Sequence, residues 1–305
     1  MSFNKLIVMK KSRKTPCEGD VFCIQPLKGI FYFGKVIKSN IENPDIHGHT
    51  LIFIYDIYSS DKNTMFNFEN KELLIPPIIV NKQPWIKGYF ETLYNTSVLE
   101  YEKKLDYGFL NVLKNIIKEE KEYLDINGNI MEHVPQYYDM YALGSYGIVG
   151  KNVQKAIICK IVQKMQQSCN FYVKEPSGKL QIPPEHTLPC EVERFYELCG
   201  GIECYAKKKK TFIKILSPDE VIQSGHLALG ENEGDALCSS WYLIARVEDG
   251  NNVFIDFSEE GSGKCYMYTQ ALSGNWSMLT KNFTEFLLSL CEYEGDDFYC
   301  KAIYK

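Results

Sequence analysis

The first part of the chain carries short runs of β-branched and aromatic residues, and turn-forming residues separate one run from the next. Runs of this kind are typical of strands that contribute one face to a core. Pro76 and Pro77 interrupt the run that follows, so we expect only a short extended piece behind them, at residues 78–80. The strands predicted ahead of this point are residues 21–25, 31–37 and 51–58.

Apolar residues recur with helical spacing further along the chain. One stripe predicts a helix over residues 105–117, and a second predicts a helix over residues 152–167. Such stripes usually form the face with which a helix packs onto a core. The first stripe consists of Leu105, Phe109, Val112, Leu113, Ile116 and Ile117, and the second of Val153, Ile157, Ile158, Ile161, Val162 and Met165.

Prolines and glycines are concentrated between residues 175 and 189, where neither periodicity continues. We interpret residues 169–189 as a proline-containing linker that proteases should reach. The length of 305 residues also favours two domains. The predicted fold class is therefore α+β, with a β-rich domain and flanking helices at residues 1–168, and a sheet with helices packed on it at residues 190–305.

Two helices are predicted in the second domain. The first covers residues 191–199, and Gly200-Gly201 behind it is expected to end the helix with a positive φ. The second begins near Asn282, an N-cap residue type that Glu285 follows three positions later.

Strands are predicted between these helices, at residues 212–216, 240–247, 252–257 and 264–268. Asp249-Gly250 joins the middle two and predicts a hairpin. Arg246 and Asp256 lie on its two arms, and we expect them to form an ion pair across it.

Composition favours a folded protein of the cytoplasm. Hydrophobic residues make up 45% and charged residues 24% of the chain, which suffices for apolar cores. No apolar run approaches the ~20 residues that span a bilayer, and the first residues lack the apolar segment of a secretory signal. The 11 cysteines include no Cys-x-x-Cys pair, so we interpret them as reduced residues, buried in the main.

The net charge of −5 is unevenly distributed, because residues 190–305 hold 11 basic and 19 acidic side chains. Nucleic acid requires a basic face, so the excess acid disfavours direct nucleic-acid binding there and suits a basic protein partner. Solubility alone would also explain such charges. The candidate interface residues are Glu231, Glu233, Asp235, Glu259 and Glu260, all in expected loops.

The chain lacks the common catalytic motifs: Gly-x-Ser-x-Gly, His-Glu-x-x-His and the kinase signature are all absent. The segment from Gly144 to Lys151 and Asn152 departs from a phosphate-binding loop in its spacing. His47 and His49 are too few for a metal site, and a solvated loop is the simpler interpretation. We therefore predict no catalytic residue, no metal site and no cofactor, while a site assembled from residues distant in sequence stays open.

The C-terminal part resembles the SUKH superfamily, which includes yeast cell-wall assembly regulators and bacterial immunity proteins. The matching pieces follow the order of that family and cover residues 180–305. They are L-P at 188–189 with V-E-R-F-Y-E-L-C-G-G at 192–201, I-L-S-P-D-E-V at 215–221, W-Y-L-I-A at 241–245, V-F-I-D-F at 253–257, G-K-C-Y at 263–266 and F-T-E-F-L-L at 283–288.

The N-terminal part resembles the immunity protein 26 family over residues 15–160. The resemblance rests on G-D-V-F at 19–22, F-Y-F-G-K-V at 31–36, P-P at 76–77, P-W-I-K-G-Y-F at 84–90 and L-G-S-Y at 143–146. An acidic, glycine-flanked segment that the family often shows is only partly kept, as D-I-N-G-N at 125–129.

Together these resemblances imply a bacterial immunity protein that neutralises a toxin without catalysis of its own. For SUKH relatives the toxin is often a nuclease, so the implied partner is a cognate protein toxin. The yeast relatives leave open an alternative, a regulatory scaffold that docks other cytoplasmic proteins. Neither resemblance identifies interface residues.

Overall fold

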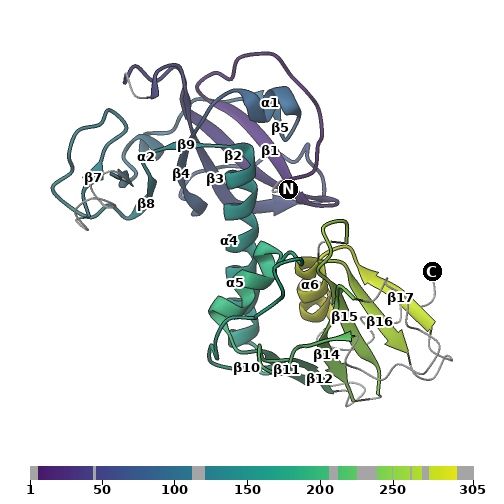
Figure 1. Ribbon diagram of the computed structural model, residues 1–305. Coiled ribbons are helices and arrows are strands. Elements are labelled where there is room, and N and C mark those ends of the chain that lie inside the picture. The colour runs from purple at the N-terminus through teal and green to yellow at the C-terminus, as the bar shows by residue number, and fades with distance from the viewer. Residues whose placement is uncertain are drawn as a thin grey trace. The chain divides into compact units, whose positions relative to one another are not determined.

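The computed structural model describes residues 6–43, 46–111, 121–205, 212–224, 239–248, 250–261, 263–269 and 275–293. The chain divides into two compact units, Ser2–Val153 and Gln154–Lys305. The division falls inside helix α4 (Tyr146–Gln167), and each unit is described by itself. Both units combine a sheet with helices, so the α+β prediction is confirmed (Figure 1).

The N-terminal unit is built on a sheet with the strand order β5-β1-β2-β3-β4-β9. Its first three strands along the chain are β1 (Asp20–Leu27), β2 (Ile30–Lys38) and β3 (Thr50–Ser59), which confirms the strands predicted from β-branched and aromatic runs. Neighbouring strands pair antiparallel, apart from the short parallel pair of β4 with β9 (Leu143–Gly144).

Strand β4 (Leu73–Val80) corrects the prediction of a short extended piece at residues 78–80, because it continues through both prolines. Its pairing with β3 passes from Ile54↔Ile75 to Ile52↔Ile78, so the prolines lie in an irregular part of the ladder. On the opposite side β9 pairs only with Ile79 and Val80. The missing N–H groups of the prolines therefore disrupt little of the ladder.

A second correction concerns the helix predicted over residues 105–117. Residues 107–110 form strand β6 (Tyr107–Leu110) of a small sheet with the order β7-β6-β8, and residues 112–120 lie outside the described residues. The spacing of Leu105 and Phe109 suited a helix, yet parallel pairing with β8 (Tyr137–Met140) holds the segment extended. Strand β7 (Tyr123–Leu124) pairs on the other side.

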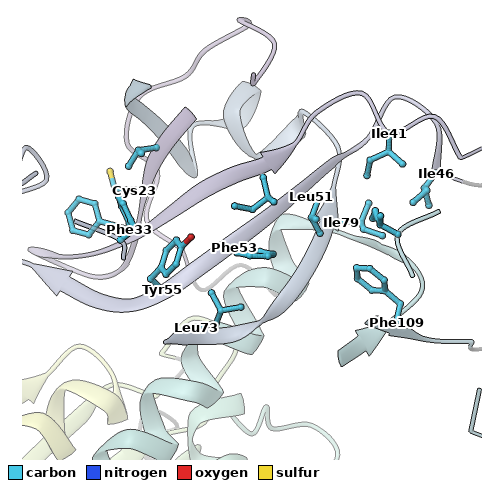
Figure 2. Close-up of a cluster of buried hydrophobic side chains, with 14 residues drawn as sticks. Cys23, Phe33, Ile41, Ile46, Leu51, Phe53, Tyr55, Leu73, Ile79 and Phe109 are labelled. Carbon is cyan, nitrogen blue, oxygen red and sulfur yellow. The ribbon is translucent and has the colours of Figure 1, made fainter. Parts of the chain in front are cut away.

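The remaining N-terminal elements are α1 (Gln83–Lys87), β5 (Phe90–Asn95) and α2 (Glu100–Lys103). Inward side chains of the large sheet form the main core, and Figure 2 shows Phe33, Phe53 and Tyr55 in it. Trp85 forms a separate aromatic cluster with Phe22 and Phe90. The rings of Phe22 and Phe90 stack, with their centroids 4.8 Å apart.

The C-terminal unit contains a sheet with the order β10-β11-β12-β14-β15-β16-β17. Helix α4 carries the second predicted stripe, and all six of its apolar side chains are buried. The strands are β10 (Phe171–Val173), β11 (Ile202–Tyr205), β12 (Phe212–Ile215), β13 (Ile222–Gln223), β14 (Trp241–Val247), β15 (Asn252–Asp256), β16 (Cys265–Thr269) and β17 (Asn275–Thr280).

The strands and the hairpin predicted here are confirmed, since β14 and β15 pair antiparallel next to Gly250, whose φ is +88°. Helix α6 (Phe283–Tyr293) begins as predicted, because the backbone N–H of Glu285 donates to Asn282 Oδ1 at 2.9 Å. Asp249 itself lies outside the described residues.

Helix α5 (Cys190–Leu198) ends differently from the prediction. Its C-cap residue Cys199 is extended, with a φ of −156°, so no left-handed glycine closes the helix. The two glycines allow close backbone approach instead. A Cβ at Gly200 would lie 2.3 Å from the carbonyl oxygen of Glu175, and Gly201 has a φ of +113°.

The segment interpreted as a linker, residues 169–189, includes strand β10, which pairs with β11. The rest of it has no helix or strand, but Leu180 is buried and the N–H of Thr187 donates to the carbonyl of Phe257 at 2.8 Å. These contacts attach it to the C-terminal sheet. The boundary between independently folding domains, predicted at residues 169–189, stays a prediction.

Candidate functional site

The acidic residues predicted to form an interface are only partly described. Glu231, Glu233 and Asp235 lie outside the described residues. Glu259 and Glu260 are both exposed in the turn between β15 and β16, adjacent in sequence and in space.

The acidic turn, residues 257–261, is held by Asp256, the last residue of β15, whose side chain is buried. Asp256 Oδ1 accepts hydrogen bonds from Ser240 Oγ and from the backbone N–H of Ser258, each at 2.8 Å. A Cβ at Gly261 would lie only 1.6 Å from Asp256 Oδ2, so this position needs glycine. The turn thus presents Glu259 and Glu260 from a fixed base.

Asp256 does not pair with Arg246, which corrects the predicted ion pair. In the hairpin Arg246 faces Asn252 and Asp256 faces Trp241. The predicted ion pair requires the two residues to face each other, but residues do so across a hairpin only at matched positions on either side of its turn. Asp256 is also buried, whereas Arg246 is exposed.

A row of polar side chains crosses four neighbouring strands on one face of the same sheet. Tyr172 faces Glu203, Glu203 faces Lys214, and Lys214 faces Arg246. The alternate residues of these strands, such as Cys204 and Ile213, are buried on the opposite face. We call the polar row, with Tyr205 beside it, the outer face of the sheet.

Ion pairs and exposed aromatic rings share this outer face. Lys174 Nζ lies 2.9 Å from Glu203 Oε1, and this hydrogen bond holds the pKa of Glu203 below its ordinary value. Lys214 pairs with Glu220 and lowers the pKa of that carboxyl to about 2. Tyr172 and Tyr205 are 59% and 51% exposed. Tyrosine and arginine are enriched at the centres of protein interfaces.

Tyr205 follows a strand pattern that is visible in the sequence, although it was not predicted as a surface residue. Residues 202–205 read Ile-Glu-Cys-Tyr, with apolar and polar positions alternating. Alternation in a strand places Glu203 and Tyr205 on one face. What sequence could not supply was the pairing with β10, which adds Tyr172 to the same face.

The N-terminal unit contains a buried ion pair that sequence analysis also missed. Lys35 on β2 and Glu102 on α2 are 1% and 0% exposed, and Lys35 Nζ lies 3.0 Å from the Glu102 carboxylate. Tyr55 donates a hydrogen bond to Glu102 Oε1, and the N–H of Leu99 donates to Oε2 at 2.6 Å. Burial, followed by this contact with Glu102, raises the pKa of Tyr55.

This network is enclosed, so it serves the fold and offers no reacting group to a substrate. Lys35 Nζ also donates to the carbonyl of Ser97 at 3.2 Å and lies 5.1 Å from the centre of the Phe68 ring. A substrate would need to displace these core contacts to reach either charge. Lys35 occupies an inward position of a predicted strand. Because buried charges are normally paired, this position indicated that an acidic side chain should be buried beside it.

Three of the buried cysteines are poor nucleophiles. Burial raises the pKa of Cys199 to about 11, and it raises the pKa of Cys23 and of Cys265 to about 12. Thiols with such pKa values stay protonated at neutral pH, and the thiolate is the reactive form.

Within the described ranges, no three His, Cys, Asp or Glu side chains are grouped so that they could hold a metal ion. His47 is exposed, and the ring of His49 contacts the carbonyl of Ile46 at 2.9 Å. Asp45, their neighbour in sequence, lies outside the described residues. No helix in the described part of the chain is long and apolar enough to cross a bilayer.

Comparison with known proteins gives a match in each part of the chain. One relative, immunity protein YokJ of Bacillus subtilis (strain 168), is 26% identical over 142 residues, which cover 46% of this chain and 86% of that protein. No solved structure matches significantly. The two resemblances inferred from the sequence are confirmed by family models: the immunity protein 26 model matches residues 17–113, and the SMI1/KNR4 family (SUKH-1) model matches residues 180–289.

Proposed function

We propose that this chain is a non-catalytic immunity protein that protects the bacterial cell producing it by binding a cognate toxin in the cytoplasm. The observation that carries the proposal is the presence of an immunity protein 26 region and a SUKH-1 region in one chain. A relative named as an immunity protein supports it. The enclosed Lys35–Glu102 pair and the protonated buried cysteines are compatible with a protein that binds and does not catalyse.

The acidic turn and the outer face of the C-terminal sheet are the surfaces we assign to the toxin. Glu259 and Glu260 project from a turn that Asp256 fixes, so little side-chain or loop ordering is needed on binding. Negative charge there would accelerate encounter with a basic toxin. A nuclease suits this surface, because a site that attracts phosphate also attracts carboxylates.

In this proposal the chain neutralises the toxin by occupying its active site, and no chemical reaction is needed. An immunity protein that covers or distorts the active site of a toxin needs shape and charge complementarity but no reacting group. The outer face supplies rigid aromatic side chains, Tyr172 and Tyr205, and the acidic turn supplies charge.

The test is co-expression with the product of a neighbouring open reading frame that is toxic when it is expressed alone. We expect cells that express both proteins to survive, cells that express the toxin alone to die, and the two proteins to purify as a complex. The double variant Glu259→Lys/Glu260→Lys should slow association on the order of tenfold at low salt and much less at high salt.

The control double variant is Glu18→Lys/Glu42→Lys, which makes the same change in net charge at exposed positions of the N-terminal unit. Its association rate should stay close to that of the parent. If survival is not restored, or no complex forms, the immunity function is wrong. If both double variants slow association equally, the acidic turn is solubilising surface and not part of the interface.

A further inference from the structure

The segment from Leu6 to Cys17 concentrates positive charge on the surface of the N-terminal unit. It contains four basic side chains and no acidic one. Like charges gathered without counterions repel one another, so a ligand of opposite charge would stabilise them. The four side chains are exposed and form no ion pair with any described residue: Lys10, Lys11, Arg13 and Lys14.

Backbone contacts hold this segment in place, although residues 6–17 form no helix or strand. The N–H of Met9 donates to the carbonyl of Gly88 at 2.7 Å, and the N–H of Ser12 donates to the carbonyl of Trp85 at 2.9 Å. Leu6 is buried, and the side chain of Met9 packs against the main core. The basic side chains therefore project from a backbone that the fold already positions.

Two aliphatic side chains are exposed beside these cations. Ile7 is 38% exposed and Val8 is 48% exposed. Gly88 lies next to both kinds of side chain, because a Cβ there would be 3.2 Å from Val8 Cγ1 and 3.1 Å from Lys11 Cγ. Lys87, exposed in the last turn of α1, precedes this glycine and adds a further positive charge. Cations and exposed aliphatic groups thus share one surface.

Two acidic side chains lie close to Lys10 but do not cancel the charge at the surface. Asp20 and Glu91 line a cavity together with Lys10, yet they are only 4% and 9% exposed. Both are also engaged within the fold, since Lys62 Nζ lies 2.8 Å from Glu91 Oε1 and Asn95 Nδ2 donates to Asp20 at 2.9 Å. The part of residues 7–14 that meets solvent is therefore positive.

This combination of side chains fits an anionic lipid surface. Lysine and arginine are attracted to acidic headgroups, and aliphatic side chains enter the boundary between the headgroups and the acyl chains. Nucleic acid offers the same negative charge, but proteins that bind its single strands add aromatic rings on which the bases stack. The exposed apolar side chains here, Ile7 and Val8, are aliphatic.

We infer that residues 7–14, together with Lys87, dock the N-terminal unit onto an anionic membrane surface. The basic side chains would contact the headgroups, while Ile7 and Val8 would enter the boundary below them. Such binding is peripheral and needs no helix that spans the bilayer. It goes beyond the proposed function and does not depend on it. A chain held at the membrane would meet a toxin that enters from outside before the toxin reaches its target.

The experiment is sedimentation of the full chain with vesicles of phosphatidylglycerol and phosphatidylcholine in equal parts. We expect binding to these vesicles and none to vesicles of phosphatidylcholine alone. Binding should fall between about 0.1 M and about 1 M salt, because the Debye length shortens from ~10 Å to ~3 Å. The far-ultraviolet circular dichroism of each variant below should match that of the parent.

Each cation near an acidic membrane should raise the partition coefficient roughly fivefold. Reversal of all four charges should therefore lower it by more than about a hundredfold. Ile7→Ser/Val8→Ser should lower it severalfold, because less apolar surface enters the lipid. The charge-reversed variant is Lys10→Glu/Lys11→Glu/Arg13→Glu/Lys14→Glu.

The matched control reverses four exposed lysines of the same unit that lie outside the segment, as Lys28→Glu/Lys71→Glu/Lys104→Glu/Lys121→Glu. It should lose less than about fivefold. Equal loss in both quadruple variants would mean that net charge alone governs binding. Absence of binding to the acidic vesicles would mean that the cations are only solvated. Unchanged binding of the serine variant, or tighter binding to duplex DNA at equal phosphate, would mean a general polyanion site. Each of these results overturns the inference, and none bears on protection by co-expression.

Discussion

The ion pairs of the two units differ in how deeply they are buried. The N-terminal unit encloses Lys35 and Glu102 in its core, at 1% and 0% exposure. The C-terminal unit keeps its pairs, Lys174–Glu203 and Lys214–Glu220, on the outer face of its sheet, with partners that are between 21% and 38% exposed. The same chemistry is therefore structural at Lys35–Glu102 and peripheral at the two pairs on the outer face.

This difference shows that the contribution of an ion pair to stability depends on where the remaining charge lies when one partner is removed. A buried charge without its partner costs several kcal/mol, whereas an exposed one is solvated by water. The N-terminal fold should thus depend on single charged residues. The C-terminal fold should depend on apolar packing, with its surface charges free to serve binding.

The largest effect is expected for Glu102→Gln. The substitution leaves Lys35 charged and buried, so it should lower the free energy of unfolding by about 3–5 kcal/mol. Urea unfolding, with hydrogen exchange resolved at β2 and β3, measures this loss. Glu100→Gln is the control, because its pair with Lys103 is exposed and should matter by less than about 0.5 kcal/mol. Equal losses in both variants would show that the buried pair has no special role.

Leu287→Ala tests whether the C-terminal fold depends on apolar packing. Leu287 is fully buried on α6, so its truncation should cost about 2–5 kcal/mol. Faster hydrogen exchange should appear in β14 and β15 and leave β1 and β2 unchanged. If exchange accelerates equally in both sheets, the two units unfold together and are not independent.

Asn282→Ala removes the cap of the same helix. The lost hydrogen bond to the N–H of Glu285 should cost about 0.5–2 kcal/mol in thermal or urea unfolding. Asn282→Asp keeps an acceptor at that position, so it should retain most of the stability. If the alanine and aspartate variants are equally unstable, the cap does not contribute.

The smallest effect is expected for the exposed pair of Lys214 with Glu220. The pKa of Glu220 lies near 2 in the folded chain, below its ordinary value of 4.5, so the pair stabilises above about pH 4.5 and the gain is lost as the pH falls toward 2. Glu220 is 38% exposed, so solvent screening should keep the gain below about 1 kcal/mol. Comparing the urea midpoints of the parent and Glu220→Gln between pH 6 and 2.5 measures it, and a constant difference would contradict it.

Much of the fold could be predicted because local pattern and tertiary structure agree. The strands near residues 21–58 and the stripe on α4 follow periodicities that burial enforces. Strand β6 could not be predicted, because its extended form depends on parallel pairing with β8, about thirty residues away. Strand β4 tolerates its prolines through a register shift that the sequence alone does not contain.

Of the candidate interface residues, the structure shows only that Glu259 and Glu260 are exposed, and their contact with a partner stays a prediction. Net charge indicated an acidic surface, and Glu259 and Glu260 are exposed on it. The anchor of that turn, Asp256, was assigned instead to an ion pair, because register across a hairpin is fixed only when the strands are paired. The row from Tyr172 to Arg246 spans four strands, so the sequence of a single strand does not predict it.

Helix α4 has a consequence for how such chains can be assembled in evolution. It lies between the two family regions, which end at residue 113 and begin at residue 180, yet its buried residues from Ile157 to Met165 belong to the C-terminal unit. Gln154 on α4 accepts a hydrogen bond from Thr284 of α6 at 3.3 Å, and Lys155 lies 3.4 Å from Glu193 of α5. A recombination event that exchanged the SUKH-1 region at its family border would leave this helix behind, so a viable exchange must begin upstream of Gln154.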